Sequence, residues 1–481
     1  MSLHAIRHNT AQRALGRRFG MLSPSLMETL GGIGSGQLSF SIASPWKHHQ
    51  PRPTPPLASS VQCVLTKQGQ RFLTKLAANA RDPKFTNKLI SKFLSSSPKS
   101  IALSTLSYLL SPDSTPPHLS SLAFPLYSKI TEESWFEWNP KLVASLAALL
   151  DKQGLHSQSE ALISETISKL GSRERELALF HCQLLESHSK LSSKHGFDST
   201  YSYLHQLLRN SSSVYVKRRA FESMVGGLCA MDRPQEADIL IEEMMVKGLK
   251  PSVFEFRSVV YGYGRLGLFE EMLKVVKNME DQGLAVDTIC SNMVLSSYGA
   301  YSELAAMVLW LRKMKNLRLP FSIRTYNSVL NSCPTIMAML QDPKDVPCSI
   351  EELNGVLNGD EGLVVKELVG STVLEEVMVW ESLEAKLDLH GLHLGSAYLI
   401  MLEWFEGMRH RFNCGECVIP AEVVIVCGLG KHSSVRGESP VKGLVKVMMH
   451  RMGSPMRIDR KNVGCFIAKG RAVKDWLFAS D

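Results

Sequence analysis

Part of this chain repeats itself every 35 residues, and no other feature of the sequence limits its fold as strongly. Met244, Met279 and Met314 occupy the same place in three successive units. Two further columns keep this spacing, namely Ile241, Val276 and Leu311, and Val225, Val260, Leu295 and Leu330. A period in the thirties is typical of stacked helical hairpins, each of which buries its apolar face against its neighbours. Such an array offers one long surface, which favours binding of an extended partner over small-molecule chemistry.

Composition and charge narrow the class of protein. The 481 residues are 44% hydrophobic and 21% charged, which is ordinary for a globular protein with room for an array and a further domain. No apolar run reaches the roughly 18 residues of a membrane span. The ten scattered cysteines are typical of reduced thiols. The net charge of +8 is uneven, because residues 428–481 hold eleven Lys/Arg against four acids. A basic end of this kind suits a polyanionic partner.

Residues 1–63 have the composition of a targeting segment. They are rich in Ser and Arg, contain Glu28 as their single acid, and are broken by a proline cluster at 51–56. These features are typical of an organelle transit peptide, and the abundance of Ser and Pro favours the chloroplast over the mitochondrion. Val61-Gln62-Cys63 resembles a cleavage site for removal of such a peptide. The alternative is a disordered basic tail.

The remaining chain divides into four parts. Residues 65–217 show helical spacing with degenerate repeats, and Gly154 and Gly196 are expected between paired helices. The clear repeats run over 218–333, as units 218–252, 253–287 and 288–322 and the start of a fourth from 323. Residues 334–385 hold eleven acids and lack the periodicity, so we expect an acidic linker that begins at Pro334.

Residues 386–478 predict a small two-layer α/β domain. The expected order is strand, helix, strand, helix, strand, strand, with a helix over Gly395–Phe412 and a buried β-branched strand over Glu422–Cys427. A second helix follows, with Ser439 as its N-cap and Pro440 in its first turn. The predicted fold is therefore an α-solenoid of helical-hairpin repeats followed by a small α/β domain.

The repeat units resemble the pentatricopeptide repeat family. The second unit, FEFRSVVYGYGRLGLFEEMLKVVKNMEDQGLAVD, and the segment RTYNSVLNSC from Arg324 carry the resemblance. The resemblance implies that the array holds single-stranded RNA, roughly one base per repeat, with one specifying residue in the first helix and another at the repeat's last position. On this register the base-reading residues are Glu222 with Ser252, Arg257 with Asp287, Asn292 with Ser322, and Asn327, which starts a fourth site.

These pairs differ in what they imply. Asn292 with Ser322 is a familiar combination in the family and implies a pyrimidine, most simply cytidine. Glu222 and Arg257 depart from the usual small polar residue, so units one and two have no assigned base. Three or four readable units do not specify a unique transcript without further contacts.

The C-terminal domain resembles the small MutS-related (SMR) domain. The resemblance rests on Leu387-Asp388-Leu389-His390-Gly391 and, after the next strand, Gly428-Leu429-Gly430-Lys431-His432-Ser433. It implies nucleic-acid binding and, in some members, endonuclease cutting. Glycine turns after strands let backbone N–H groups approach a phosphate. The expected phosphate-binding residues are Gly428, Gly430, Lys431, His432 and Arg436.

Asp388 and His390 are the candidate catalytic base and acid of this domain. The alternative is a buried pair that hydrogen-bonds the neighbouring loop. Cys427 stands where the SMR family usually has threonine or histidine, which counts against catalysis more than against binding. Cys414 and Cys417 are interpreted as part of a loop, and no metal site is predicted.

The sequence thus predicts an organellar RNA-binding protein that acts in RNA metabolism, with single-stranded RNA and other RNA-processing proteins as partners. One alternative is an RNA endonuclease acting through the C-terminal domain, and another is a helical scaffold that binds protein. No cofactor is expected, except a divalent cation if the domain is a nuclease.

Overall fold

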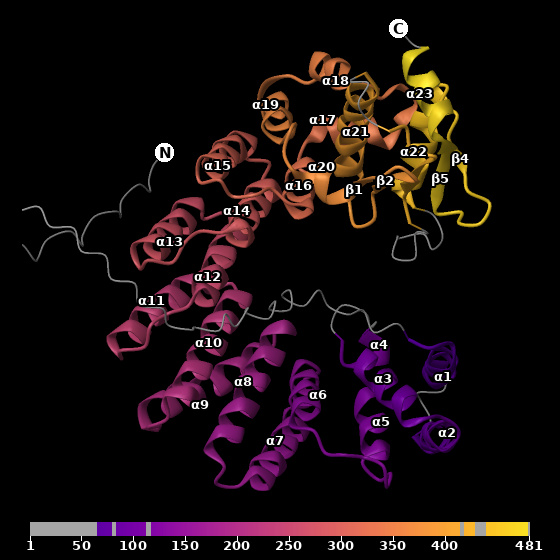
Figure 1. The fold of residues 1–481 in the computed structure, drawn as a ribbon. Helices are drawn as coiled ribbons and strands as arrows, with labels where there is room; N and C mark the ends of the chain where they lie inside the picture. The colour runs from indigo at the N-terminus through magenta and orange to yellow at the C-terminus, as the bar shows by residue number, and fades with distance from the viewer. Residues whose placement is uncertain (1–64, 79–82, 112–116, 414–417, 429–438, 480–481) are drawn as a thin grey trace, which may run out of the picture. The chain divides into compact units, whose positions relative to one another are not determined.

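In the computed structural model, the described residues are 65–78, 83–111, 117–413, 418–428 and 439–479, and helices dominate them (Figure 1). The first group of helices forms a separate apolar core around Leu76, Ile90, Leu106 and Leu126, together with one face of α6. These helices are α1 (Lys67–Ala78), α2 (Pro83–Ser96), α3 (Lys99–Leu109), α4 (Pro117–Ser120) and α5 (Ala123–Ile130). The targeting segment predicted for 1–63 lies outside the described residues.

Two hairpins follow, as the degenerate repeats within 65–217 predict. They are formed by α6 (Pro140–Lys152) with α7 (His156–Leu170) and by α8 (Glu174–Lys190) with α9 (Lys194–Asn210). Gly154 lies between α6 and α7 as expected. The expectation for Gly196 is wrong, because it lies inside α9 and the chain turns instead at Ser192, which adopts a positive φ of 52°.

The 35-residue units form hairpins that stack in succession. Their first helices are α10 (Val214–Ala230), α12 (Val253–Arg265), α14 (Thr288–Ala300) and α16 (Ile323–Leu330). Their second helices are α11 (Pro234–Val246), α13 (Phe269–Asp281), α15 (Leu304–Asn316) and α17 (Pro334–Gln341). Each first helix contacts the next one along the array (Figure 1). Met244, Met279 and Met314 are all fully buried, which confirms the apolar columns.

Close approach of the first helices also follows the 35-residue period. The hydroxyl of Ser297 packs where a Cβ at Gly264 would stand, and Ser332 packs in the same way against Gly299. Glycine at this position therefore lets α12, α14 and α16 come close enough for the polar residues near their N-termini to meet across neighbouring units.

The acidic linker predicted for 334–385 is folded instead. Pro334 begins α17 and so completes a fourth hairpin, as proline is well tolerated in the first turn of a helix. After a 3-10 turn (Pro343–Asp345) come α18 (Ile350–Val356), α19 (Gly359–Leu368), α20 (Val373–Val377) and strand β1 (Met378–Trp380). Leu353, Val364 and Leu368 are fully buried. One acid of the segment, Glu367, forms ion pairs with both Arg312 and Lys315 of α15.

The C-terminal part is an α/β domain with a five-stranded sheet of order β1-β2-β3-β5-β4. Its elements are β2 (Glu384–Asp388), α21 (Leu394–Asn413), β3 (Glu422–Val426), α22 (Pro440–Arg451), β4 (Arg457–Ile458), β5 (Cys465–Lys469) and α23 (Gly470–Phe478). The predicted order of strands and helices is confirmed, and β1 and α23 extend it. Strands β2 and β3 are parallel, and the other neighbours are antiparallel.

Helix α21 joins this domain to the repeats through one continuous core. The fully buried Tyr326 of α16 places its hydroxyl 2.7 Å from the Leu368 carbonyl and 2.9 Å from a carboxylate oxygen of Glu403 on α21. Burial raises the pKa of Glu403 to about 7. The first helices and the loops at the ends of β2 and β3 therefore belong to one packed unit.

Candidate functional site

The second residue of each predicted base-reading pair is the N-cap of the next first helix. Ser252, Asp287 and Ser322 begin α12, α14 and α16, and each side chain accepts a hydrogen bond from a backbone N–H of the first turn. Serine and aspartate are favoured there because they satisfy amides that have no partner within the helix. Local chemistry therefore fixes these three side chains at 35-residue intervals along one side of the array.

Asn292 and Ser322, the pair of unit three, lie together. The Asn292 Nδ2 donates to the Ser322 Oγ at 3.2 Å, and the Thr325 hydroxyl donates to the Asn292 Oδ1 at 2.8 Å. Asn292 is 5% exposed, so these two bonds fix the orientation of its amide. An asparagine amide offers two N–H donors and two lone pairs, so each end retains half of its capacity.

Arg257 and Asp287, the pair of unit two, are also brought together. The Arg257 guanidinium forms an ion pair with one Asp287 carboxylate oxygen, and the other oxygen accepts the Cys290 N–H at 2.9 Å. The arginine side chain is 17% exposed and the aspartate 44%. The predicted base-reading position of unit two is thus occupied by an ion pair whose charges neutralise each other.

The remaining predicted positions have other partners. Glu222 pairs with Arg219 on its own helix, whereas Ser252 forms a capping box with Glu255. Asn327 connects the repeats to the C-terminal domain. Its Nδ2 donates to the Gly391 carbonyl at 3.1 Å, and its Oδ1 accepts the His393 N–H at 2.8 Å. Unit one and the fourth position therefore lack the arrangement seen in units two and three.

A hollow with several polar residues in its wall lies beside this connection, between α14, α16 and the turn after β2. Among the residues that line it are Ser296, Arg324, Ser328, Asn331 and His393. Arg324 and Asn331 are exposed. The sequence does not predict this hollow, although Ser296 and Asn331 are 35 residues apart and hence occupy the same position in successive units.

The candidate catalytic residues meet at the carboxyl ends of parallel strands β2 and β3. Asp388 ends β2, and its Oδ1 accepts the His390 N–H at 2.9 Å. His390 is exposed, lies next to Gly428, and is therefore not part of a buried pair, although Asp388 does hydrogen-bond the loop after β2 as the alternative expects. Gly391 and Gly428 both have positive φ, at 86° and 75°, which glycine adopts without strain.

The structure thus brings Asp388, His390 and Gly428 to one edge of the sheet. The other expected phosphate-binding residues, Gly430, Lys431, His432 and Arg436, lie outside the described residues, as do Cys414 and Cys417. Ser439 accepts the Lys442 N–H and begins α22, which confirms the predicted cap. Within the described residues, no helix combines the length and apolar character needed to cross a membrane.

Comparison with known proteins agrees with the hairpin array. A family model described as PPR repeat matches residues 219–249 and 256–284. Pentatricopeptide repeat-containing protein At2g17033 of Arabidopsis thaliana is 57% identical over 415 residues, which cover 86% of this chain and 82% of the relative. The chain therefore belongs to the pentatricopeptide repeat family.

More distant similarities cover less of either protein. Pentatricopeptide repeat-containing protein ATP4, chloroplastic, of Zea mays is 19% identical over 272 residues, which cover 54% of this chain and 39% of that protein. The crystal structure of the pentatricopeptide repeat protein PPR10 in complex with an 18-nt psaJ RNA element matches with a TM-score of 0.33 and 17% identity. The match covers 60% of this chain and 42% of the PPR10 chain. This chain thus spans less than half of the PPR10 chain.

Proposed function

We propose that this protein binds single-stranded RNA along its first helices and acts in organellar RNA processing. The observation that carries the proposal is the repeated pair, because Arg257–Asp287 and Asn292–Ser322 have the same arrangement one unit apart. Regular spacing of polar side chains on stacked helices suits a strand whose base edges are unpaired. Membership in the pentatricopeptide repeat family and the RNA in the PPR10 complex support the same function.

Unit three is the strongest base-reading unit in this proposal. The Asn292 amide is held in one orientation by Ser322 and Thr325, and it keeps one N–H and one acceptor lone pair for a base edge. Such a fixed donor and acceptor suit the Watson–Crick edge of a pyrimidine. Unit two contributes less discrimination, since Arg257 is neutralised by Asp287.

The C-terminal domain adds sequence-independent affinity in this proposal. Arg324 and the hollow beside it lead from α16 to the turn at Gly391. Backbone N–H groups at the Gly391 and Gly428 turns suit phosphate oxygens, and Lys431, His432 and Arg436 follow in the sequence. The resemblance to the SMR domain agrees with this role and explains how a short array gains affinity.

We place the protein in the chloroplast, with the mitochondrion as the alternative. The composition of residues 1–63 favours the first. The names of related proteins include both organelles, since ATP4 is named as chloroplastic and At3g56030 as mitochondrial. Other RNA-processing proteins are the expected protein partners. Import of the full chain, fused to a fluorescent protein, into isolated organelles of both kinds separates the two locations.

Binding of short RNAs to the full chain tests the RNA proposal. Asn292→Ala should reduce discrimination between cytidine and adenosine at one position by about tenfold, as expected for loss of one base contact of about 1–3 kcal/mol. Asn278→Ala on second helix α13 is the matched control and should leave discrimination unchanged. The logarithm of the RNA-binding constant should fall linearly with the logarithm of salt concentration. An RNA affinity that does not depend on salt concentration, or a base discrimination that is the same in Asn292→Ala and wild type, would contradict the proposal and favour a protein-binding scaffold.

Cleavage of RNA is the second candidate function, favoured by the exposed His390 ring beside the Gly428 turn and the Asp388 carboxylate. If the domain cuts, Asp388→Asn should abolish cleavage with and without Mg²⁺ while RNA affinity changes less than twofold. Asp459→Asn, which changes an acid between β4 and β5, is the control. Equal cleavage by wild type and Asp388→Asn would exclude a nuclease centred on Asp388.

A further inference from the structure

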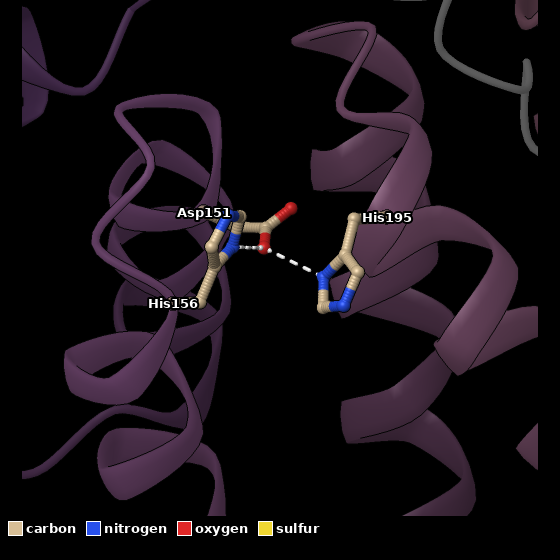
Figure 2. A group of neighbouring side chains, drawn as sticks. All are labelled: Asp151, His156 and His195. Atoms are coloured by element: carbon tan, nitrogen blue, oxygen red, sulfur yellow. Dashed lines mark hydrogen bonds and ion pairs between the residues drawn. The ribbon is translucent and has the colours of Figure 1, made fainter.

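A buried carboxylate in the upstream hairpins is surrounded by histidines from three other helices. Asp151 lies in the last turn of α6, and its side chain is 4% exposed. Its Oδ1 lies 2.6 Å from the Nδ1 of His156 at the start of α7 and 3.1 Å from the Nδ1 of His195 in the first turn of α9. Figure 2 shows both imidazole rings approaching this oxygen from different sides.

The second oxygen of the carboxylate is held by the backbone and side chain of α9. The Gly196 N–H donates to the Asp151 Oδ2 at 3.0 Å, and the Ser193 hydroxyl donates to the same oxygen. The Asp151 carboxylate thus accepts hydrogen bonds from Ser193, His156, His195 and Gly196, and these bonds fix its orientation.

His188 supplies an independent observation at the same place. It lies on α8, is 1% exposed, and its Nδ1 is 3.7 Å from the Asp151 Oδ2. Neither ring nitrogen makes a hydrogen bond to the described residues. Its ring fills the space where a side chain at residue 196 would stand, which requires Gly196. Packing alone does not call for two unsatisfied nitrogens, because an apolar ring would fit without that penalty.

We propose that Asp151, His156 and His195 bind a zinc ion, with water as the fourth ligand. The Asp151 Oδ1 and the Nδ1 atoms of the two histidines are the proposed ligands, since both nitrogens lie within 3.1 Å of that oxygen. One ligand atom from each of the three residues lies within 4.8 Å of the others. Two imidazoles with one carboxylate favour a transition metal over Mg²⁺ or Ca²⁺. His188 is a positioning residue behind the carboxylate, where it orients a ligand oxygen.

The rings need to move only slightly to accept the ion. Zn–N and Zn–O bonds of about 2.0–2.1 Å in a tetrahedral site place two ligand atoms roughly 3.3 Å apart. In the structure, the Asp151 Oδ1 is 2.6 Å from the His156 Nδ1 and 3.1 Å from the His195 Nδ1. The His156 and His195 side chains are 49% and 65% exposed, so both rings have room to shift. Zinc would displace the Nδ1 protons and tie α6, α7 and α9 together.

This site is independent of the RNA-binding proposal and was not predicted from the sequence. Its residues are spread over 44 positions, and the spacing of Asp151 and His156 matches no common metal motif.

Zinc binding by the full chain tests the proposal. Equilibrium dialysis against Zn²⁺, followed by metal analysis, should find one more equivalent in the wild type than in the double variant His156→Ala/His195→Ala. Zn²⁺ should also raise the Tm of the wild type by roughly 2–4 °C and leave that of the double variant unchanged. His205→Ala, a half-buried histidine on α9, is the control and should behave as the wild type.

A second variant guards against misfolding. His156→Gln/His195→Gln keeps hydrogen-bonding groups beside Asp151 but replaces both zinc-binding nitrogens. Circular dichroism should show a native helical content, and the extra equivalent of zinc should be lost. The same stoichiometry and the same zinc-dependent Tm in wild type, control and both double variants would overturn the proposal and leave a purely hydrogen-bonded cluster.

Discussion

The upstream hairpins (α6–α9) and the downstream hairpins (α12–α16) hold neighbouring helices together in different ways. Downstream, the fully buried columns of Val260, Met279, Leu295 and Met314 fill the interior, and the polar pairs stand near the helix N-termini. Upstream, Asp151, His181 and His188 are themselves buried. Polar side chains are buried in both regions, as Asn292 and Thr325 are downstream, but only upstream does a buried histidine stand beside a buried carboxylate.

This difference assigns a structural role to the buried carboxylate upstream and a binding role to the polar pairs downstream. A buried carboxylate that accepts four hydrogen bonds has no capacity left for a strand of RNA, but it fixes the geometry of one junction. Pairs at the helix starts cap the helices and keep free hydrogen-bonding groups. We therefore expect some substitutions downstream to change RNA affinity without changing the stability of the fold. Substitutions upstream should change the stability, its dependence on pH and its response to metal.

The largest loss of stability is expected for Met279→Ala. This side chain is fully buried in the apolar column, so its truncation removes transfer free energy and leaves a cavity that costs about 2–5 kcal/mol. Met279→Leu, which nearly conserves volume, should cost less than about 1.5 kcal/mol. Urea unfolding followed by circular dichroism measures both. Similar midpoints for Met279→Ala and Met279→Leu would show that packing downstream is looser than the columns indicate.

The loss of stability on acidification from pH 7 to pH 4 should arise upstream. His181 is stacked on Tyr203 with ring centroids 3.7 Å apart, and burial lowers its pKa from 6.5 to about 4. As pH falls, His181 is protonated in the unfolded chain before it is protonated in the folded one. Its contribution to the free energy of unfolding is therefore complete above pH 6.5, and on the order of 3 kcal/mol of that free energy is lost as pH falls to about 4.

His181→Phe keeps the aromatic stack and removes the titrating group, so its stability should fall less between pH 7 and pH 4. His205→Phe, at a position that is 29% exposed, should retain the wild-type dependence. Urea midpoints at five pH values make the measurement. An identical slope in His181→Phe and wild type would place the sensitivity elsewhere.

Asp151→Asn should cost about 1–3 kcal/mol, since one carboxylate oxygen becomes an NH₂ group that faces the Ser193 hydroxyl and the Gly196 N–H. The amide retains the volume, so the loss measures hydrogen bonding rather than packing. Hydrogen exchange should show faster opening of α9 than of α14. Uniform acceleration along the array would mean that the junction is not a local element.

Local chemistry was predictable from the sequence, and contacts between distant segments were not. The apolar columns and the Ser439 cap rest on spacings of a few residues or one repeat, so they could be placed in register. The 334–385 segment was misjudged because its eleven acids hid short helices whose buried faces hold only two or three apolar residues, such as Val364 and Leu368.

The contacts of the candidate site also divide into those that the repeat register predicts and those between distant segments. The contact between Asn292 and Ser322 follows from the repeat register, because the two residues have fixed places in successive hairpins. The bonds of Asn327 to Gly391 and His393 depend on how the α/β domain packs against α16, across 64 and 66 residues of chain. No local pattern encodes that packing, and the same holds for the cluster around Asp151.

The smallest effect on stability is expected for Asp287→Ala, which separates the two roles of the downstream pairs. Loss of the N-cap of α14 should cost about 1 kcal/mol, and the Arg257 guanidinium loses its ion-pair partner at the same time. Because this cation is then free for phosphate, RNA affinity should rise about two- to fivefold at low salt while the salt slope steepens. Asp287→Asn keeps a good cap and frees Arg257 equally, so it should show the gain in affinity with little loss of stability. If both variants bind RNA as the wild type does, Arg257 does not face the strand, and unit two serves only to connect its neighbours.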